Sequence, residues 1–153
     1  MDLRAAFPVT FKESIVDRQL VPGAVLYLEV TFPEDRNTKN KFLVLVAAID
    51  DDLLLFPINS NVNPFVEKNP ALRRCQIRID QDEHQFLAYD SFIACQKTLT
   101  LPKEAVAAEL VAGTALYHGV VSENIRQSIL GSIRTSPPTL SAFHRNAIIA
   151  ALS

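Results

Sequence analysis

The sequence lacks a cysteine motif, a membrane-spanning segment and a signal peptide. Its two cysteines lack the C-x-x-C spacing of a metal or redox motif, so we expect Cys75 and Cys95 to be buried, reduced thiols. No stretch approaches the roughly 20 consecutive apolar residues that a membrane-spanning helix requires, and the first residues lack the apolar run of a signal peptide. We therefore expect a cytoplasmic protein without membrane association.

The sequence also lacks a charge excess of either sign. Its 15 Lys and Arg against 17 Asp and Glu give a formal net charge of -2. Proteins that hold nucleic acid by bulk electrostatics usually carry a clear basic excess, so this balance argues against that class and leaves room only for a local basic groove. The sequence contains no internal repeat or low-complexity run, and 153 residues with 48% hydrophobic content suffice for one ordinary core.

A series of β-strand patterns fills much of the first two thirds of the sequence. Residues 24–32 are rich in β-branched, aromatic and aliphatic side chains and end at Pro33, which predicts a first strand. Residues 42–49 are apolar on both faces, which predicts a central, buried strand. The acidic residues 50–52 form a tight turn into a third apolar run, 53–58, so the second and third strands should form a hairpin.

Later patterns add further strands and then helices. Residues 75–80 alternate apolar and polar side chains, which is typical of a half-exposed strand, and residues 86–95 predict one or two more strands. The remaining predicted elements are a helix at 103–111, a strand within 114–121, a helix capped by Ser122, and an amphipathic segment at 139–152. Strands first and helices late indicate an α+β, mostly β fold whose strands curl into a small barrel.

Five short motifs occur along the chain in a definite order. They are Pro22-Gly23-Ala24-Val25, the polar connection 34–41 before Phe42-Leu43-Val44-Leu45-Val46, Phe56-Pro57-Ile58-Asn59-Ser60, residues 90–100 (DSFIACQKTLT), and Val121-Ser122-Glu123 with the helix after it. In this order and spacing they resemble the MazF/PemK family, the toxin half of a class of bacterial toxin-antitoxin pairs. The match predicts a divergent member of that family.

The resemblance predicts a division of the chain into three parts. Residues 21–135 correspond to the family's barrel domain, residues 1–20 to an N-terminal extension, and residues 136–153 to a C-terminal amphipathic helical extension. The family implies an SH3-like small β-barrel that forms a homodimer and is restrained by an antitoxin protein. Active members cut single-stranded RNA without a metal or other cofactor.

Such cleavage needs a general base for the 2′-hydroxyl proton, an acid for the leaving 5′-oxygen, and donors that stabilise the negative phosphorane. By the resemblance, the catalytic arginine of the family falls on Lys41, with Arg36 and Lys39 nearby in the preceding loop. The catalytic threonine falls on Asn59 or Ser60, depending on a one-residue choice of alignment. Lysine binds phosphate as a point charge and lacks the planar fork of arginine. Asparagine donates hydrogen bonds but transfers no proton near neutral pH, whereas serine has the hydroxyl of threonine.

Two further positions correspond to the RNA groove of the family. Gln96 and Lys97 directly follow a predicted buried strand, at the place where the family has a glutamine that helps to hold RNA. With Arg36 and Lys39, they form the predicted RNA-binding set. Each candidate also has a plain structural explanation, since loop lysines are usually solvated and asparagine and serine commonly form turns.

Two other clusters suggest different chemistry. His84 follows Asp82-Glu83 and would suit a general base or a metal ligand, but a charged turn is the preferred interpretation. The three carboxylates at 50–52 resemble a metal cluster, yet consecutive side chains in a tight turn point in different directions, so we expect a turn and no metal site.

The main hypothesis is a metal-independent endoribonuclease toxin that acts on single-stranded RNA. The first alternative is a catalytically impaired member of the same fold that serves as a protein- or nucleic-acid-binding module, because both catalytic residue types of the family are replaced. The second alternative is an unrelated enzyme built around His84.

Overall fold

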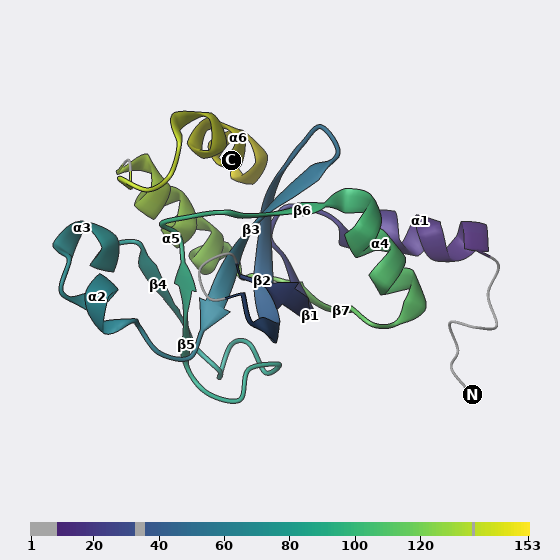
Figure 1. Ribbon diagram of the computed structural model, residues 1–153, viewed down its shortest axis with the longest axis horizontal. Coiled ribbons are helices and arrows are strands. Elements are labelled where there is room, and N and C mark those ends of the chain that lie inside the picture. The colour runs from purple at the N-terminus through teal and green to yellow at the C-terminus, as the bar shows by residue number, and fades with distance from the viewer. Residues whose placement is uncertain (1–8, 33–35, 136) are drawn as a thin grey trace.

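The computed structural model describes residues 9–32, 36–135 and 137–153, and its centre is a curled antiparallel sheet (Figure 1). The strands are β1 (Ala24–Thr31), β2 (Thr38–Ile49), β3 (Asp52–Asn59), β4 (Gln76–Ile79), β5 (Ser91–Ala94), β6 (Leu99–Pro102) and β7 (Leu116–Val120). Their order across the sheet is β4-β5-β3-β2-β1-β7, and β6 pairs with β3 outside this path. The predicted α+β, mostly β fold is confirmed.

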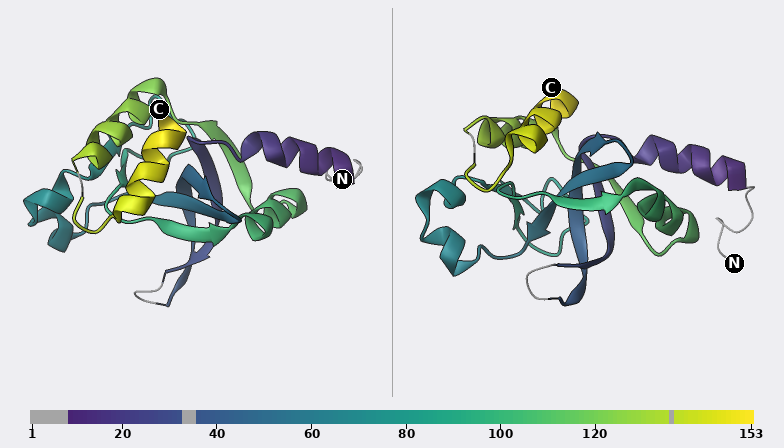
Figure 2. Two further views of the ribbon diagram at one scale, coloured as in Figure 1. Left: turned by 90° about the horizontal axis from the view of Figure 1, so that it is seen from above. Right: turned by 45° about the horizontal axis from the view of Figure 1, so that its top comes forward.

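Helices cover the two faces of the sheet. They are α1 (Val9–Gln19), α2 (Pro64–Glu67), α3 (Pro70–Arg73), α4 (Lys103–Ala112), α5 (Glu123–Arg134) and α6 (Ala142–Leu152). Figure 2 shows α5 and α6 together on one side of the sheet and α4 with α1 on the other. In the described part of the chain, none of these helices is long and apolar enough to cross a membrane.

The β2–β3 hairpin forms the middle of the sheet, as the sequence predicts. Its register pairs Ile49 with Asp52 at the turn and Leu43 with Pro57 at the far end. Asp50 has a φ of 52°, a left-handed conformation that aspartate tolerates better than most residues. The acidic residues therefore form the expected turn, and the two buried strands run back along each other.

The strand β3 makes the sheet curl because it has three partners. Residues 52–57 pair with β2, residues 52–55 pair with β6, and Ile58 and Asn59 pair with β5. Pairing with β2 ends at Pro57, which lacks an amide hydrogen. The end of β3 thus reaches a junction where β2, β5 and the connections after β3 and β5 meet.

The core consists of one apolar cluster on each side of this sheet. On one side Val44, Phe56 and Ile93 pack with Ile129 of α5 and Ile148 of α6. On the other side Leu26, Leu43 and Leu53 pack with Val106 and Leu110 of α4. Alternate residues of a strand point to opposite faces, which explains why the nearly continuous apolar runs of β2 and β3 supply both clusters. Cys75 and Cys95 are buried free thiols, as expected.

Three local features go beyond what the sequence predicts. The segment after Asn61 contains two short helices, because Asn63 and Asn69 each cap a helix that starts with proline. Residues 86–89 form a turn and bends, so the predicted region 86–95 contributes one strand, β5. The short strand β6 was not predicted, because its few residues precede a proline that also starts a helix.

Candidate functional site

The candidate site is built at the open end of the β2–β3 hairpin. Leu43 of β2 pairs with Pro57 of β3. Two residues further along each strand, Lys41 and Asn59 therefore face each other on the same side of the sheet. The Lys41 ammonium Nζ donates a hydrogen bond to Asn59 Oδ1 at 2.5 Å. Two candidate residues that are 18 positions apart in the sequence thus form a direct pair.

Burial changes the charge chemistry of Lys41. Partial burial lowers the pKa of its ammonium from the ordinary lysine value, and the positive charge of Lys39 lowers it further. Lys39 lies two residues earlier on the exposed part of the same strand. Lys41 is therefore a better proton donor than an ordinary surface lysine.

A cavity of about 400 Å³ adjoins this pair. We call it the central hollow, and it is lined by Lys41, Asn59, Ser60, Asn61, Val62, Asn63 and Pro64. Ser60 is exposed there. The hollow holds all three predicted catalytic positions, and its lining has no acidic side chain.

A second cavity, of about 350 Å³, also borders Asn59. We call it the glutamine hollow, and its lining includes Phe32, Pro57, Asn59, Gln96, Lys97 and Thr98. The Gln76 amide Nε2 donates to Gln96 Oε1 at 2.8 Å, which fixes the orientation of that glutamine. The structure thus places the predicted RNA-binding residues Gln96 and Lys97 in one cavity with Asn59.

The helix α6 and the segment before it support the turn that carries Gln96 and Lys97. Thr98 Oγ1 and His144 Nδ1 of α6 are hydrogen-bonded at 2.7 Å, and Thr139 Oγ1 donates to the Gln96 backbone oxygen. The two residues of this pair are 46 positions apart in the sequence and belong to different elements. No local pattern signals such a contact.

The two remaining basic candidates lie at the rim. Arg36 has a left-handed φ of 54°, and its amide donates to the Phe32 oxygen at 3.0 Å, which places its backbone beside the glutamine hollow. Lys39 pairs with Val30 across the hairpin formed by β1 and β2. The rest of this polar connection, residues 33–35, lies outside the described residues.

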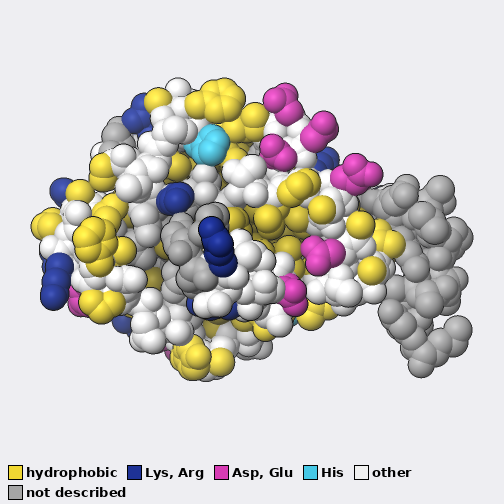
Figure 3. Space-filling view, in the orientation of Figure 1, with side chains coloured by type: hydrophobic (Ala, Val, Ile, Leu, Met, Phe, Trp, Pro, Cys, Tyr) yellow, Lys and Arg dark blue, Asp and Glu magenta, His cyan; other side chains and the backbone are white. Residues whose placement is uncertain are grey.

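Charge is unevenly distributed on the molecule. On the face drawn in Figure 3, acidic side chains gather at the upper right, over the tip of the β2–β3 hairpin and α4, whereas Lys and Arg side chains lie over the middle and left. The tip carries Asp50, Asp51 and Asp52, at the opposite end of the hairpin from Lys41 and Asn59. The site end of the hairpin is therefore the more suitable one for an anion.

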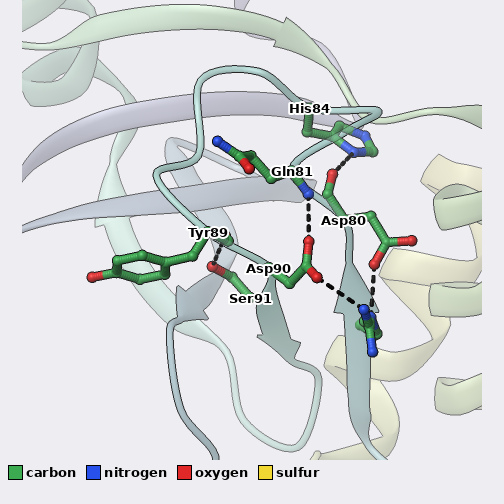
Figure 4. Close-up of polar contacts among 7 residues, drawn as sticks. Asp80, Gln81, His84, Tyr89, Asp90 and Ser91 are labelled. Atoms are coloured by element: carbon green, nitrogen blue, oxygen red, sulfur yellow. Dashed lines mark hydrogen bonds and ion pairs between the residues drawn. The ribbon is translucent and has the colours of Figure 1, made fainter.

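The segment between β4 and β5 borders the site and is held by a polar network (Figure 4). Asp90 Oδ1 accepts a hydrogen bond from the Gln81 amide at 2.9 Å, and Ser91 Oγ donates to the Tyr89 oxygen at 3.0 Å. Asp90 and Ser91 thus have a structural role, because both hold the backbone of this segment. His84 is 5% exposed and contacts the Asp80 backbone oxygen through Nδ1, so its imidazole supports the loop rather than an open site.

Metal binding has no support in the described residues. Within 9–32, 36–135 and 137–153, no group of three or more His, Cys, Asp or Glu side chains is arranged to hold a metal ion. The polar groups that do converge at the site are an ammonium, amides and hydroxyls, which suit an anion and not a divalent cation.

Comparisons with known proteins identify the fold. No family model matches this sequence, and no curated protein is similar to it in sequence. The structure resembles a chain in the crystal structure of a MazE–MazF complex from Deinococcus radiodurans, with a TM-score of 0.50 and 8% identity, over 75% of this chain and 92% of that chain. The fold is therefore MazF-like, which confirms at the level of fold the resemblance seen in the motifs.

Proposed function

We propose that this chain is a MazF/PemK-like toxin of a toxin-antitoxin pair, and that it cleaves single-stranded RNA without a metal or cofactor. The observation that carries the proposal is the contact between Lys41 and Asn59, which joins two positions selected by the family motifs in one open hollow. The MazF-like fold supports the same assignment.

The proposed reaction uses the groups of the central hollow. The 2′-oxygen of a ribose forms a bond to the neighbouring phosphorus, and the bond from phosphorus to the 5′-oxygen breaks. Lys41 stabilises the phosphorane as a cation and donates a proton to the leaving 5′-oxygen, a role favoured by its lowered pKa. Asn59 donates from its amide nitrogen, since its Oδ1 already accepts from Lys41. Ser60 contacts the 2′-hydroxyl, whose proton passes to water in the open hollow.

The groove around the hollow binds the flanking nucleotides. Gln96 and Lys97 lie in a cavity that shares Asn59 with the central hollow, so one strand can contact both. Arg36 and Lys39 supply positive charge at the rim. A few phosphate contacts of this kind can hold a short single strand even though the whole chain carries a net charge of -2.

Two protein partners belong to the proposal. The first is a second copy of this chain in a homodimer, and the second is an antitoxin protein. The solved neighbour was crystallised as a MazE–MazF complex, which supports an antitoxin partner for a chain of this fold. In this scheme residues 21–135 carry the barrel and the site, and residues 1–20 and 136–153 are extensions.

A second candidate function is that of a binding module without catalysis. The specific observation in its favour is that the residue hydrogen-bonded to Lys41 is an asparagine, whose amide transfers no proton near neutral pH. Loss of a placed acid or base typically lowers a rate by about 10²–10⁴-fold. Such a protein would bind RNA or a protein partner through the same hollows.

The deciding experiment incubates the purified chain with a mixed-sequence single-stranded RNA in excess EDTA. We expect cleavage by the wild type and a loss of about 100-fold or more in Lys41→Ala. Lys103→Ala is the matched control, because Lys103 is exposed at the start of α4, outside the central hollow and the glutamine hollow, and should behave like the wild type. RNA binding without cleavage would support the second candidate, and the absence of both would reject the proposal.

A further inference from the structure

Tyr89 is an exposed aromatic residue on a well-held loop. It is 60% exposed, although large aromatic rings usually pack against other side chains. In Figure 4 its ring extends away from the hydrogen-bonded groups of the loop. The network around Tyr89 involves its backbone, since Ser91 Oγ donates to the Tyr89 oxygen. The ring is therefore presented to solvent by a fixed backbone.

Two ion pairs of Arg78 stabilise the loop between β4 and β5 that carries Tyr89. Arg78 of β4 contacts Asp80 at 2.7 Å and Asp90 at 2.9 Å, so one guanidinium joins the two ends of the segment between β4 and β5. The Gln81 amide adds a bond to Asp90. A backbone held in this way loses little conformational freedom when the residue on it binds a ligand.

Tyr89 lines a cavity that opens beside the central hollow. This tyrosine hollow has a volume of about 230 Å³ and is lined by Tyr27, Asn40, Lys41, Phe42, Ile58, Ser60, Leu87, Ala88, Tyr89 and Ser91. It shares Lys41 and Ser60 with the central hollow. Tyr27 and Phe42 add a second aromatic surface, with ring centroids 4.5 Å apart.

The tyrosine hollow and the glutamine hollow lie on opposite sides of β3. Ile58 lines the first, whereas Pro57 and Asn59 line the second, and alternate residues of a strand point to opposite faces. The central hollow lies between them because it contains Asn59 as well as Ser60. A single strand of nucleic acid that crosses the end of β3 can thus place a phosphate at Lys41 and one base on each side.

We propose that the tyrosine hollow binds a nucleobase of single-stranded RNA, stacked on the ring of Tyr89, next to the phosphate held by Lys41. This inference rests on the proposed function and names a base subsite for it. Aromatic rings, a shared lysine and hydroxyl and amide groups suit a base attached to a phosphate backbone, and no lining residue is acidic. An aromatic ring can stack on any base, so the subsite contributes mainly to the affinity for RNA and little to the choice of sequence.

The test measures the binding of a fluorescent, uncleavable 2′-O-methyl RNA oligonucleotide to the full chain. We expect Tyr89→Ala and Tyr89→Leu to weaken binding about tenfold or more, because neither keeps an aromatic face. Tyr89→Phe should stay within about twofold of the wild type, since it keeps the ring. Phe143→Ala is the matched control, because Phe143 is an exposed aromatic residue, 67% exposed, on α6. Because the Tyr89 side chain is exposed, its replacement should not unfold the protein, and thermal melting of the variants checks this.

The outcomes separate the two claims. If Lys41→Ala weakens RNA binding and Tyr89→Ala does not, the base subsite is wrong and the proposed function stands. If the wild type binds no RNA, both are wrong. A labelled acidic peptide provides a second arm: if Tyr89→Ala leaves RNA binding intact and abolishes peptide binding, the hollow is a protein site and the inference is overturned.

Discussion

Lys41 and Asn59 form a hydrogen bond of 2.5 Å across the open end of the β2–β3 hairpin. Each residue alone has an ordinary explanation as a loop lysine or a turn asparagine. Together they place an ammonium against an amide in a hollow that shares residues with a cavity on either side of β3. This pair is the structural basis of the proposed RNA site, and the following predictions test it and its surroundings.

Asn59→Asp should weaken RNA binding by about tenfold or more, because a carboxylate next to Lys41 neutralises its charge and repels phosphate. The same carboxylate should raise the pKa of Lys41 relative to the wild type, since an opposite charge favours the ammonium. Binding of a single-stranded oligonucleotide at low salt measures the first effect. Asp17→Asn is the control. Asp17 is an exposed residue of α1, outside the hairpin, so this change should leave RNA binding unaffected. Equal affinity of Asn59→Asp and wild type would contradict the prediction.

The pH dependence of stability should reveal the lowered pKa of Lys41. Burial, assisted by the charge of Lys39, lowers the pKa in the folded state, so the unfolded chain holds the proton over a range in which the folded chain has begun to lose it. Stability linked to this group therefore rises with pH from the lowered value toward the ordinary lysine value of about 10.4.

The measurement compares urea unfolding of the wild type and Lys41→Met across that pH range. Because the other titratable groups are common to both chains, the difference isolates Lys41. We expect the wild type to gain stability relative to Lys41→Met as the pH rises. A difference that stays constant, or that falls with pH, would contradict the assignment.

The contact between Thr98 and His144 should stabilise the turn that carries Gln96 and Lys97. His144→Ala removes a hydrogen bond of 2.7 Å between α6 and this turn, and we expect a loss of about 1 kcal/mol in the free energy of unfolding. Phe143→Ala, at the exposed neighbouring position, should cost much less. Urea unfolding measures both, and an equal effect of the two changes would argue against a specific role for the imidazole.

Arg78→Ala should loosen the Tyr89 loop without unfolding the protein. Its ion pairs with Asp80 and Asp90 are exposed to solvent, so their loss should change the global stability little. Hydrogen exchange of the amides between β4 and β5 should nevertheless become faster, since both ends of the loop lose their shared partner. Unchanged exchange in this loop would show that its order does not depend on Arg78.

Much of the fold could be predicted from local patterns. The apolar runs of β2 and β3 and the acidic turn between them determine the hairpin, and Ser122 caps α5 through a bond from the Ile125 amide at 3.2 Å. The short helices after Asn63 and Asn69 were missed because the asparagine and proline that start them are also typical of loops. The strand β6 was missed because its pairing with β3 is long-range.

The candidate site could be predicted only in part. Family motifs located Lys41 and Asn59, but only the register of the hairpin shows that they touch. The sequence pattern predicts a strand at Tyr89. Only the structure shows that Tyr89 lies on a loop held by Arg78 and that its side chain is exposed. His144 lies in a segment outside the motifs, and it reaches Thr98 only because α6 packs back onto the sheet.

The most direct test of the account is a double-mutant cycle on the cleavage of single-stranded RNA in EDTA, with Lys41→Ala, Asn59→Ala and the double variant. If the two side chains act as one unit, each single change should slow cleavage strongly, and the double variant should be little slower than the slower single variant, with a coupling of about 1 kcal/mol or more. Cleavage by both single variants at the wild-type rate would contradict the central claim.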